Sequence, residues 1–389
     1  MPRVYLDHNA SSPLRPAARD AIARLLHSPP ANPGSVHAEG HRARMILEGV
    51  REEVAALLGA PPDSIVLTGG GTESNNLAIF GAIASAPAGR RRIVTTAFEH
   101  PSVRAIMDEL ERLGDEIIRV RPSRSGIVTA EAVLNAAGDD ATLVSIMLAN
   151  NEIGTLQPVA AVGRALAGRA TILHCDAAQA AGKVPIDVET LGVDLLSIAG
   201  HKFGGPQGVG ALFVRSGTSL RPHLLGGGQE LNRRPGSENV AALAGLGAAA
   251  TAARDDLEAE AARIGSLRDE LERRLLVSEP DAVVHGADAL RVPNTSCLSF
   301  GGVTGEGLVI ALDLEGIAVS AGSACSAGTI RKSESLEAMG LDRESRAAIR
   351  ISLGHTTTRG EIESVAATLP GVLARLRGSA AVSTGAERS

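Results

Sequence analysis

The chain has 389 residues, and only three of its 38 basic residues are lysines, Lys183, Lys202 and Lys332. Five Phe, one Tyr, no Trp and a net charge of −6 argue against modules that stack bases or neutralise phosphate backbones, so no direct nucleic-acid binding is expected. The length suits two to three domains, and with no long apolar run in the sequence we expect no membrane span and no signal peptide, hence a soluble, cytoplasmic chain.

Hydrophobic periodicity predicts that helices and strands alternate through the first part of the chain. Apolar residues recur at helical spacing over 43–58, and the β-rich run 65–67 follows a Pro-Pro turn. Further strands are predicted at 93–96, 116–120, 142–148, 171–175, 194–199 and 208–214, with helices at 102–113, 129–137 and 159–167. Such an α/β order indicates a mostly parallel seven-stranded sheet covered on both faces, because parallel strands need crossover helices. Ligands of such sheets bind at the carboxyl ends of the strands.

The remaining residues predict a second, smaller unit. Residues 239–276 have the composition and spacing of one or two long helices. Short strands at 282–284, 297–300, 318–320 and 349–352, with a helix at 305–314, indicate a smaller α+β domain. We expect a large domain over 15–260, a small domain formed by 1–14 and 261–377, and a disordered tail at 378–389.

A glycine-rich segment, residues 68–76, lies between a predicted strand and a helix expected to begin near Leu77. Its backbone N–H groups could bind a phosphate at the start of that helix. It is not a Walker A loop, since no Lys-Ser/Thr follows the glycines, and not a dinucleotide fingerprint, since Ser74 replaces the third Gly. A tight turn that needs glycine for positive φ is the simpler alternative.

Two polar clusters follow later strands. In His174-Cys175-Asp176 a metal site lacks a third ligand at suitable spacing, whereas a carboxylate at the end of a buried strand needs a cationic partner. In His201-Lys202 the lysine precedes a Gly-rich turn at the edge where ligands bind. Lys183 and Lys332 lie in what we interpret as solvated connections, so Lys202 is the Schiff-base candidate, with an ordinary ion-pairing lysine as the alternative.

These features together are the parts that a pyridoxal phosphate (PLP) enzyme needs. They are a phosphate-binding helix start, a carboxylate that keeps the pyridinium nitrogen protonated, and a lysine for the aldehyde. His100 follows the predicted strand 93–96 and could lie against the ring or move protons, although such a histidine is more often a helix cap or a core residue.

Two more residues attract attention in the smaller domain. Cys325 lies in a run of Gly, Ser and Ala, the setting of an exposed, reactive thiol, although an unreactive loop thiol is the alternative. Cys175 and Cys297 have the surroundings of core cysteines. Arg350 lies in an apolar strand-like run, where an arginine needs a carboxylate from the protein or from a substrate.

With these residues in view, the sequence resembles the NifS/IscS-type cysteine desulfurases, which are PLP enzymes of fold type I in the class V aminotransferase superfamily. The matching motifs run in order along nearly the whole chain: Tyr5-Leu6-Asp7-His8-Asn9-Ala10, Asn32-Pro33-Gly34-Ser35, Gly71-Thr72-Glu73-Ser74-Asn75-Asn76, Glu99-His100, Asn150-Asn151-Glu152, Asp176-Ala177-Ala178-Gln179, His201-Lys202, Gly226-Gly227-Gly228-Gln229-Glu230, Arg234-Pro235-Gly236-Ser237, Gly322-Ser323-Ala324-Cys325 and Arg350-Ile351-Ser352.

The resemblance implies a set of cofactor-binding residues: Gly71, Thr72, His100, Asp176, Gln179, His201, Lys202 and, from the partner subunit of a homodimer, Ser237. Lys202 would form the Schiff base and take the Cα proton of the substrate. Asp176 would pair with the ring nitrogen, Gln179 would bond the ring hydroxyl, and His100 would stack on the ring. Thr72, His201 and Ser237 would hold the phosphate.

The resemblance also implies the substrate and the reaction. Asn151 and Arg350 would bind the carboxylate of L-cysteine, and the Cys325 thiolate would attack its sulfur, leaving a persulfide and releasing alanine. A mobile loop around Cys325 would present the sulfur to an acceptor, such as a scaffold for Fe–S clusters or a thio-modification protein. No metal is implied.

Three residues depart from the family pattern, in which Ser, Lys and Thr often stand at the positions of Ala199, Gln207 and Ser237. These changes could weaken PLP retention. The alternatives are therefore a selenocysteine lyase, a non-catalytic scaffold of sulfur transfer, and a class V aminotransferase or epimerase without sulfur chemistry. The last has no need of Cys325.

Overall fold

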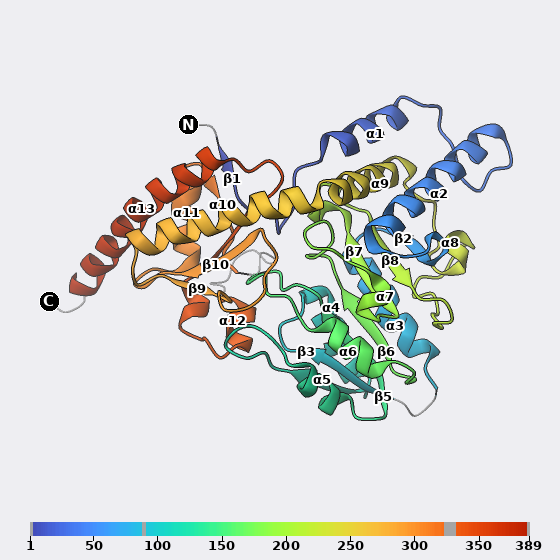
Figure 1. Ribbon diagram of the computed structural model, residues 1–389, viewed down its shortest axis with the longest axis horizontal. Coiled ribbons are helices and arrows are strands. Elements are labelled where there is room, and N and C mark those ends of the chain that lie inside the picture. The colour runs from blue at the N-terminus through green and yellow to red at the C-terminus, as the bar shows by residue number, and fades with distance from the viewer. Residues whose placement is uncertain (1–2, 88–90, 323–331, 387–389) are drawn as a thin grey trace.

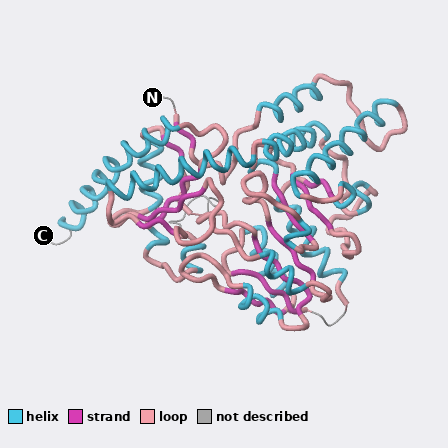
Figure 2. Tube along the Cα trace, viewed as in Figure 1, coloured by secondary structure: helices cyan, strands magenta, loops and turns pink. Residues whose placement is uncertain are grey.

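The computed structural model describes residues 3–87, 91–322 and 332–386, with side chains described as far as residue 378. Two groups of strands are visible in Figure 2, a large one and a small one. Figure 1 shows that the large group lies among the helices from the first two thirds of the chain, and that the small group lies beside α10, α11 and α13.

The large group is a sheet of seven strands in the order β2-β8-β7-β6-β5-β3-β4. Neighbouring strands are parallel, except that β8 runs antiparallel to both β2 and β7. This arrangement confirms the predicted mostly parallel sheet. Every strand lies within two residues of its predicted position: β2 Ile65–Thr68, β3 Arg92–Thr96, β4 Glu116–Val120, β5 Ala141–Met147, β6 Ile172–Asp176, β7 Leu195–Ala199 and β8 Gly210–Val214.

Helices cover both faces of this sheet, because successive side chains of a strand point to opposite faces and both sets are apolar. Val66, Leu143 and Leu195 pack with α3 and α4 on one face. Leu67 and Val144 share the other face with residues of α2, α5, α6 and α9. The helices of this part are α1 Pro16–Leu26, α2 Ala38–Leu58, α3 Gly71–Ser85, α4 Pro101–Arg112, α5 Ala130–Ala137, α6 Val159–Leu166, α7 Val188–Leu191, α8 Gln229–Asn232 and α9 Val240–Asp255.

The small group consists of an antiparallel sheet, β12-β10-β9, and a parallel pair, β1 with β11. Its elements are β1 Val4–Tyr5, α10 Leu257–Ser278, β9 Val283–His285, β10 Thr295–Ser299, α11 Gly305–Leu314, β11 Ile317–Ala318, α12 Glu334–Ala338, β12 Ala348–Ser352 and α13 Arg359–Ala386. Three short 3₁₀ turns complete the structure: η1 Pro62–Ser64, η2 Gly200–Lys202 and η3 Glu344–Arg346.

The N-terminal segment belongs to the small part by its packing. Val4 and Leu6 share a hydrophobic cluster with residues between 264 and 373, and Asp7 forms a bridge with Ser352. The division into 15–260 and 1–14 with 261–377 remains a proposal, which this cluster supports. The helix α10 starts against the large part and packs along α13 in the small part (Figure 1).

The helix α3 begins six residues earlier than we expected, at Gly71 and not near Leu77. Gly70, with φ of 136°, turns the chain from β2 directly into the helix. Ser74 and Asn75 lie in the first turns of this helix, although side chains of these types compete for backbone hydrogen bonds. Both are buried, and Ser74 Oγ instead lies 2.7 Å from Thr68 Oγ1.

The C-terminal segment also differs from the expected disordered tail, since α13 continues to Ala386. The segment contains no Pro, and extending a helix that is already docked avoids the nucleation step. Residues 387–389 lie outside the described part of the chain. Among the described helices, none combines the length and the apolar character needed to cross a bilayer.

Candidate active site

A cavity of about 400 Å³ lies at the carboxyl ends of β5, β6 and β7, where the sheet topology predicts a ligand site. Nine of the eleven predicted site residues line it: Gly71, Thr72, His100, Asn151, Asp176, Gln179, His201, Lys202 and Arg350. In the described structure, Ser237 is exposed and does not line this cavity. Cys325 lies outside the described residues.

The first turn of α3 forms one wall of the cavity. The first N–H groups of a helix have no partner within the helix, so the Gly71-Thr72 turn is suited to bind an anion. Gly71 also packs close to the end of β7: a Cβ at this position would lie 3.2 Å from the Ala199 Cβ. A larger residue at position 71 would therefore narrow the space between α3 and β7.

Asp176, the last residue of β6, supplies a buried carboxylate at the base of the cavity. Its Oδ2 accepts from Asn75 Nδ2 at 2.8 Å, and its Oδ1 accepts from the backbone N–H of Ala178 at 2.9 Å. These neutral donors hold the carboxylate in place without neutralising its charge. Asn75, which we did not single out from the sequence, points back from α3 to make this contact.

His100 is the N-cap of α4, and Pro101 occupies the first helical position. Its Nδ1 accepts from the backbone N–H of Ser102, so the proton of the neutral ring sits on Nε2. Burial lowers the pKa of His100, and the nearby Lys202 lowers it further against the opposing effect of Asp176. A neutral imidazole therefore lines the cavity.

Lys202 ends the turn η2 after β7, and its Nζ donates to the carbonyl oxygens of Asn9 at 2.6 Å and Ala10 at 3.1 Å. The neighbouring His201 has a buried Nδ1 that finds no hydrogen-bond partner among the described residues. Burial, with Lys202 and Lys183 adding to it, lowers the pKa of His201 to about 4. The neutral ring has one N–H, for which the backbone of Ala10 competes, since a hydrogen bond to it raises the pKa against these effects.

Arg350 on β12 is only 3% exposed and reaches the cavity from the small part. It donates to the carbonyl of Asn151 at 3.0 Å and pairs with Asp7 at 2.8 Å, which confirms the expected carboxylate partner. Its Nε has no hydrogen-bond partner within the described part of the chain.

Our interpretation of Lys183 as a solvated residue was wrong. Lys183 is buried, and its Nζ donates to Asn9 Oδ1 at 2.9 Å and Gln179 Oε1 at 2.7 Å. The position before Val-Pro-Ile-Asp looked like a surface connection, and contacts with segments distant in sequence, Asn9 among them, enclose it. Lys332 is 40% exposed at its side chain and pairs with Glu337, as expected for a solvated lysine.

The residues of this cavity fit PLP. The unpartnered His201 Nδ1 and the first turn of α3 can hold a phosphate, and the Asp176 carboxylate can face a protonated ring nitrogen. The Lys202 amine is in the same cavity. Within the described residues no three His, Cys, Asp or Glu side chains are grouped so that they could hold a metal ion.

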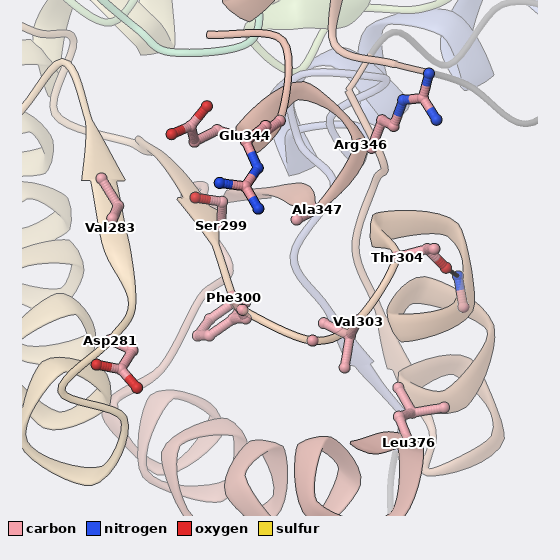
Figure 3. A pocket seen from close by; sticks show the side chains of 14 residues that line it. Asp281, Val283, Ser299, Phe300, Val303, Thr304, Glu344, Arg346, Ala347 and Leu376 are labelled. Carbon is pink, nitrogen blue, oxygen red and sulfur yellow. Dashed lines mark hydrogen bonds between the residues drawn. The ribbon is translucent and has the colours of Figure 1, made fainter. Parts of the chain in front are cut away.

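A larger cavity, about 630 Å³, lies in the small part between the β10–α11 loop, η3 and α13. Figure 3 shows Phe300, Val303 and Leu376 along one side of it, with Glu344 and Arg346 opposite. It has none of the predicted site residues and no lysine, histidine or cysteine in its lining. The predicted catalytic and binding residues therefore lie at the smaller cavity and not at this one.

The chain is similar to known proteins over nearly its whole length. Residues 4–365 match the model of the aminotransferase class-V family. An IscS-like cysteine desulfurase of Mycobacterium tuberculosis is 41% identical and aligns with 99% of this chain and 100% of its own. The cysteine desulfurase NifS of Azotobacter vinelandii is 38% identical, over 97% of this chain and 94% of its own. A solved NifS-like protein superposes with a TM-score of 0.90 at 34% identity, covering 96% of this chain and 99% of its own.

Proposed function

The chain belongs to the aminotransferase class-V family, and we propose that it is a PLP-dependent L-cysteine desulfurase that converts L-cysteine to L-alanine and a persulfide on Cys325. The observation that carries this proposal is the shared cavity of Lys202, Asp176 and the first turn of α3. Relatives named cysteine desulfurases, at 38% to 41% identity over nearly the whole chain, identify the reaction.

When bound, PLP supplies an electron sink that stabilises negative charge at the substrate Cα. Asp176 would keep a proton on the ring nitrogen, and the turn at Gly71-Thr72 would bind the phosphate together with His201. His100 would lie against the ring. Gln179 would offer an amide N–H to the ring hydroxyl.

The chain's own residues then bind the substrate and move its proton. Arg350, through the Nε that lacks a protein partner among the described residues, and Asn151 bind the carboxylate of L-cysteine. Lys202 takes the proton from Cα. The carbonyls of Asn9 and Ala10 hold the Nζ of Lys202 on this side of the cavity.

Cys325 supplies the thiolate that accepts the sulfur. Its Sγ attacks the sulfur of L-cysteine, so that an S–S bond forms while the Cβ–S bond breaks. The electron pair of the broken bond stays with Cβ, which takes a proton, Lys202 returns a proton to Cα, and alanine leaves. The terminal sulfur of the persulfide then passes to an acceptor protein, a scaffold for Fe–S clusters or a thio-modification partner.

The proposal includes a cytoplasmic homodimer in which Ser237 reaches the phosphate site of the partner subunit. Its support is the exposure of Ser237 and its absence, in the described structure, from the cavity of its own chain. Of the two departures on this chain's own side, Ala199 lines the cavity, whereas Gln207 is exposed and donates to Ser11 Oγ at 3.2 Å. We therefore expect Ala199 to affect PLP retention more than Gln207 does.

The test measures products and the attachment site. With L-cysteine and a thiol reductant, purified protein should release alanine and sulfide in equal amounts, and Cys325→Ser should abolish sulfide, while Lys332→Met should retain it. Undiminished sulfide from Cys325→Ser contradicts the mechanism.

Borohydride reduction of the coloured protein should attach the cofactor to Lys202, and recovery of the label at Lys183 or Lys332 would contradict the proposed site. A colourless protein would favour the scaffold alternative, and a faster rate on L-selenocysteine would favour the lyase.

A further inference from the structure

Lys183 is a buried amine immediately behind the wall of the cavity. It is four residues after Gln179 in the turn that follows β6, and it does not line the cofactor cavity itself. Burial lowers its pKa well below the ordinary value, and the positive charges of Lys202 and Arg350 lower it further. A lysine is rarely enclosed in this way unless its donors are used. Both of its hydrogen-bond acceptors belong to residues beside the cavity.

The first acceptor, Gln179 Oε1, fixes which way the Gln179 amide faces. Gln179 Nε2 donates to the carbonyl of Asn9 at 2.9 Å, and a carbonyl oxygen can only accept. The amide oxygen therefore turns to Lys183, 2.7 Å away. The amide nitrogen carries two hydrogens, and Asn9 takes one of them. The second is left for the cavity that Gln179 lines.

The second acceptor is Oδ1 of Asn9, the residue whose main-chain carbonyl accepts from Lys202. The Asn9 side chain also donates to Thr295 Oγ1 at 2.8 Å and to the Asn151 carbonyl at 3.2 Å, and it accepts from Asn294 at 2.9 Å. Its main-chain carbonyl takes both the Lys202 Nζ and the Gln179 amide. One buried amine thus bonds both to Asn9 and to Gln179, and the carbonyl oxygen of Asn9 accepts from Gln179 and from Lys202.

We propose that Lys183 is a positioning residue that acts through Gln179, holding its amide so that an N–H and not the oxygen faces the ring hydroxyl of PLP. This inference rests on the site proposed above. Without Lys183, Gln179 Oε1 would be a buried acceptor without a donor, and the amide would turn, against its contact with the Asn9 carbonyl, to find another donor. The cofactor would lose the donor, although Lys183 never touches it.

The test is a double-mutant cycle on the PLP affinity of apoprotein. Lys183→Met keeps an unbranched side chain one atom shorter and removes the donors, and Gln179→Ala removes the side chain through which Lys183 acts. In the natural background Lys183→Met should weaken PLP binding about tenfold, corresponding to about 1.4 kcal/mol. In the Gln179→Ala background the same change should alter affinity by less than about twofold. Lys332→Met, the same substitution at an exposed lysine, should leave affinity unchanged.

The spectrum of the bound cofactor gives a second readout. If the ring hydroxyl loses its donor, Lys183→Met and Gln179→Ala should shift the visible absorbance in the same direction. An equal loss of affinity in both backgrounds, or no loss in the natural one, overturns the inference. If Lys183→Met does not fold, Lys183→Gln enters the same cycle, because it keeps one donor and should lose less affinity than Gln179→Ala does. Failure of the wild-type protein to bind PLP at Lys202 would instead overturn the proposed function.

Discussion

Glu99, the residue before His100, is a fully enclosed carboxyl group without a cationic partner in hydrogen-bond contact among the described residues. Thr96 Oγ1 and the backbone N–H of Met147 both donate to its Oε1, at 2.6 and 3.0 Å. Its buried Oε2 has no partner in the described structure. Burial is the main cause that raises the pKa of Glu99 to about 8, and the charge of Asp176 adds to it. A pKa near 8 favours the protonated form of Glu99 at neutral pH.

The pH dependence of stability follows from this shift. Because the folded state binds the Glu99 proton more tightly than the unfolded state, this group makes stability fall as the pH rises from about 4.5 to about 8. The slope approaches about 1.4 kcal/mol per pH unit within that window. Glu99→Gln mimics the protonated acid, so its urea midpoint should change less than that of the wild type between pH 5.5 and pH 8. Glu109→Gln, at an exposed ion pair with Arg112, is the matched control. Parallel pH profiles for Glu99→Gln and wild type would show that Glu99 is ionised.

Residues at strand ends were the ones that sequence could place in the site. Asp176 and Lys202 each follow a strand with clear periodicity, and strand ends of a parallel sheet meet at one edge. Lys183 could not be placed, because its burial depends on Asn9, which is far away in the sequence. The orientation of the Gln179 amide depends on both Lys183 and Asn9, so it could not be predicted from the sequence either.

At the scale of single elements, α8 contains the most unusual backbone of the described chain. Glu230, Leu231 and Asn232 have positive φ angles of 48°, 58° and 63°. Left-handed conformations cost a residue with a Cβ roughly 1–2 kcal/mol each. The buried Glu230 holds this turn: both of its carboxylate oxygens pair with Arg51 at 2.6 Å, and Oε2 also accepts from the N–H of Leu67 at 2.7 Å.

Two substitutions in this turn should change stability in opposite directions. Arg51→Met leaves the Glu230 carboxylate buried without its cation and should destabilise the protein by about 3 kcal/mol or more. Asn232→Gly removes a left-handed residue with a Cβ and should stabilise it by about 0.5–1 kcal/mol. Urea unfolding of both variants beside the wild type checks this. A destabilised Asn232→Gly would mean that the Asn232 side chain, not the ion pair, holds the turn.

Regular elements were predicted well because their apolar patterns are long. The errors fall where tertiary contacts determine the boundary of an element or its backbone conformation. The strand β4 was predicted with its observed bounds, Glu116–Val120. The start of α3 was missed because Asn75 and Ser74 are polar, and their partners Asp176 and Thr68 belong to other elements. The turn at 230–232 has no glycine to signal its positive φ angles.

At the scale of the whole molecule, the stretch from 221 to 238 is the surface that we expect to meet a second copy. Leu225 is 90% exposed and Leu231 is 66% exposed in it, and Ser237 follows. Arg234 pairs with Glu73 in the first turn of α3 at 2.7 Å, which places this surface beside the phosphate end of the cavity. Exposed leucines on a monomer are favourable to bury in an interface.

Sedimentation velocity should therefore show a dimer, and Leu225→Asp should shift it toward the monomer. The same variant should bind PLP more weakly, because Ser237 would no longer reach the site of its partner. Leu314→Asp, at a residue that is 84% exposed in the small part, should do neither. A monomeric Leu225→Asp protein with unchanged PLP affinity would remove Ser237 from the phosphate site.

The early position of Asn9 in the chain has a consequence for protein synthesis. β1, which precedes Asn9, pairs with Ile317 and Ala318, and the N–H of Asn9 bonds Ser352. At 5–20 residues per second, a ribosome takes on the order of 15 to 60 s to add the roughly 300 residues that separate these partners. Once β8, which ends at Val214, has been made, the nascent large part can form its sheet but has no fixed acceptor for Lys202 until these partners follow. The cofactor site is thus a late product of translation, and a nascent chain truncated before residue 317 should fold its sheet without acquiring the colour of bound PLP.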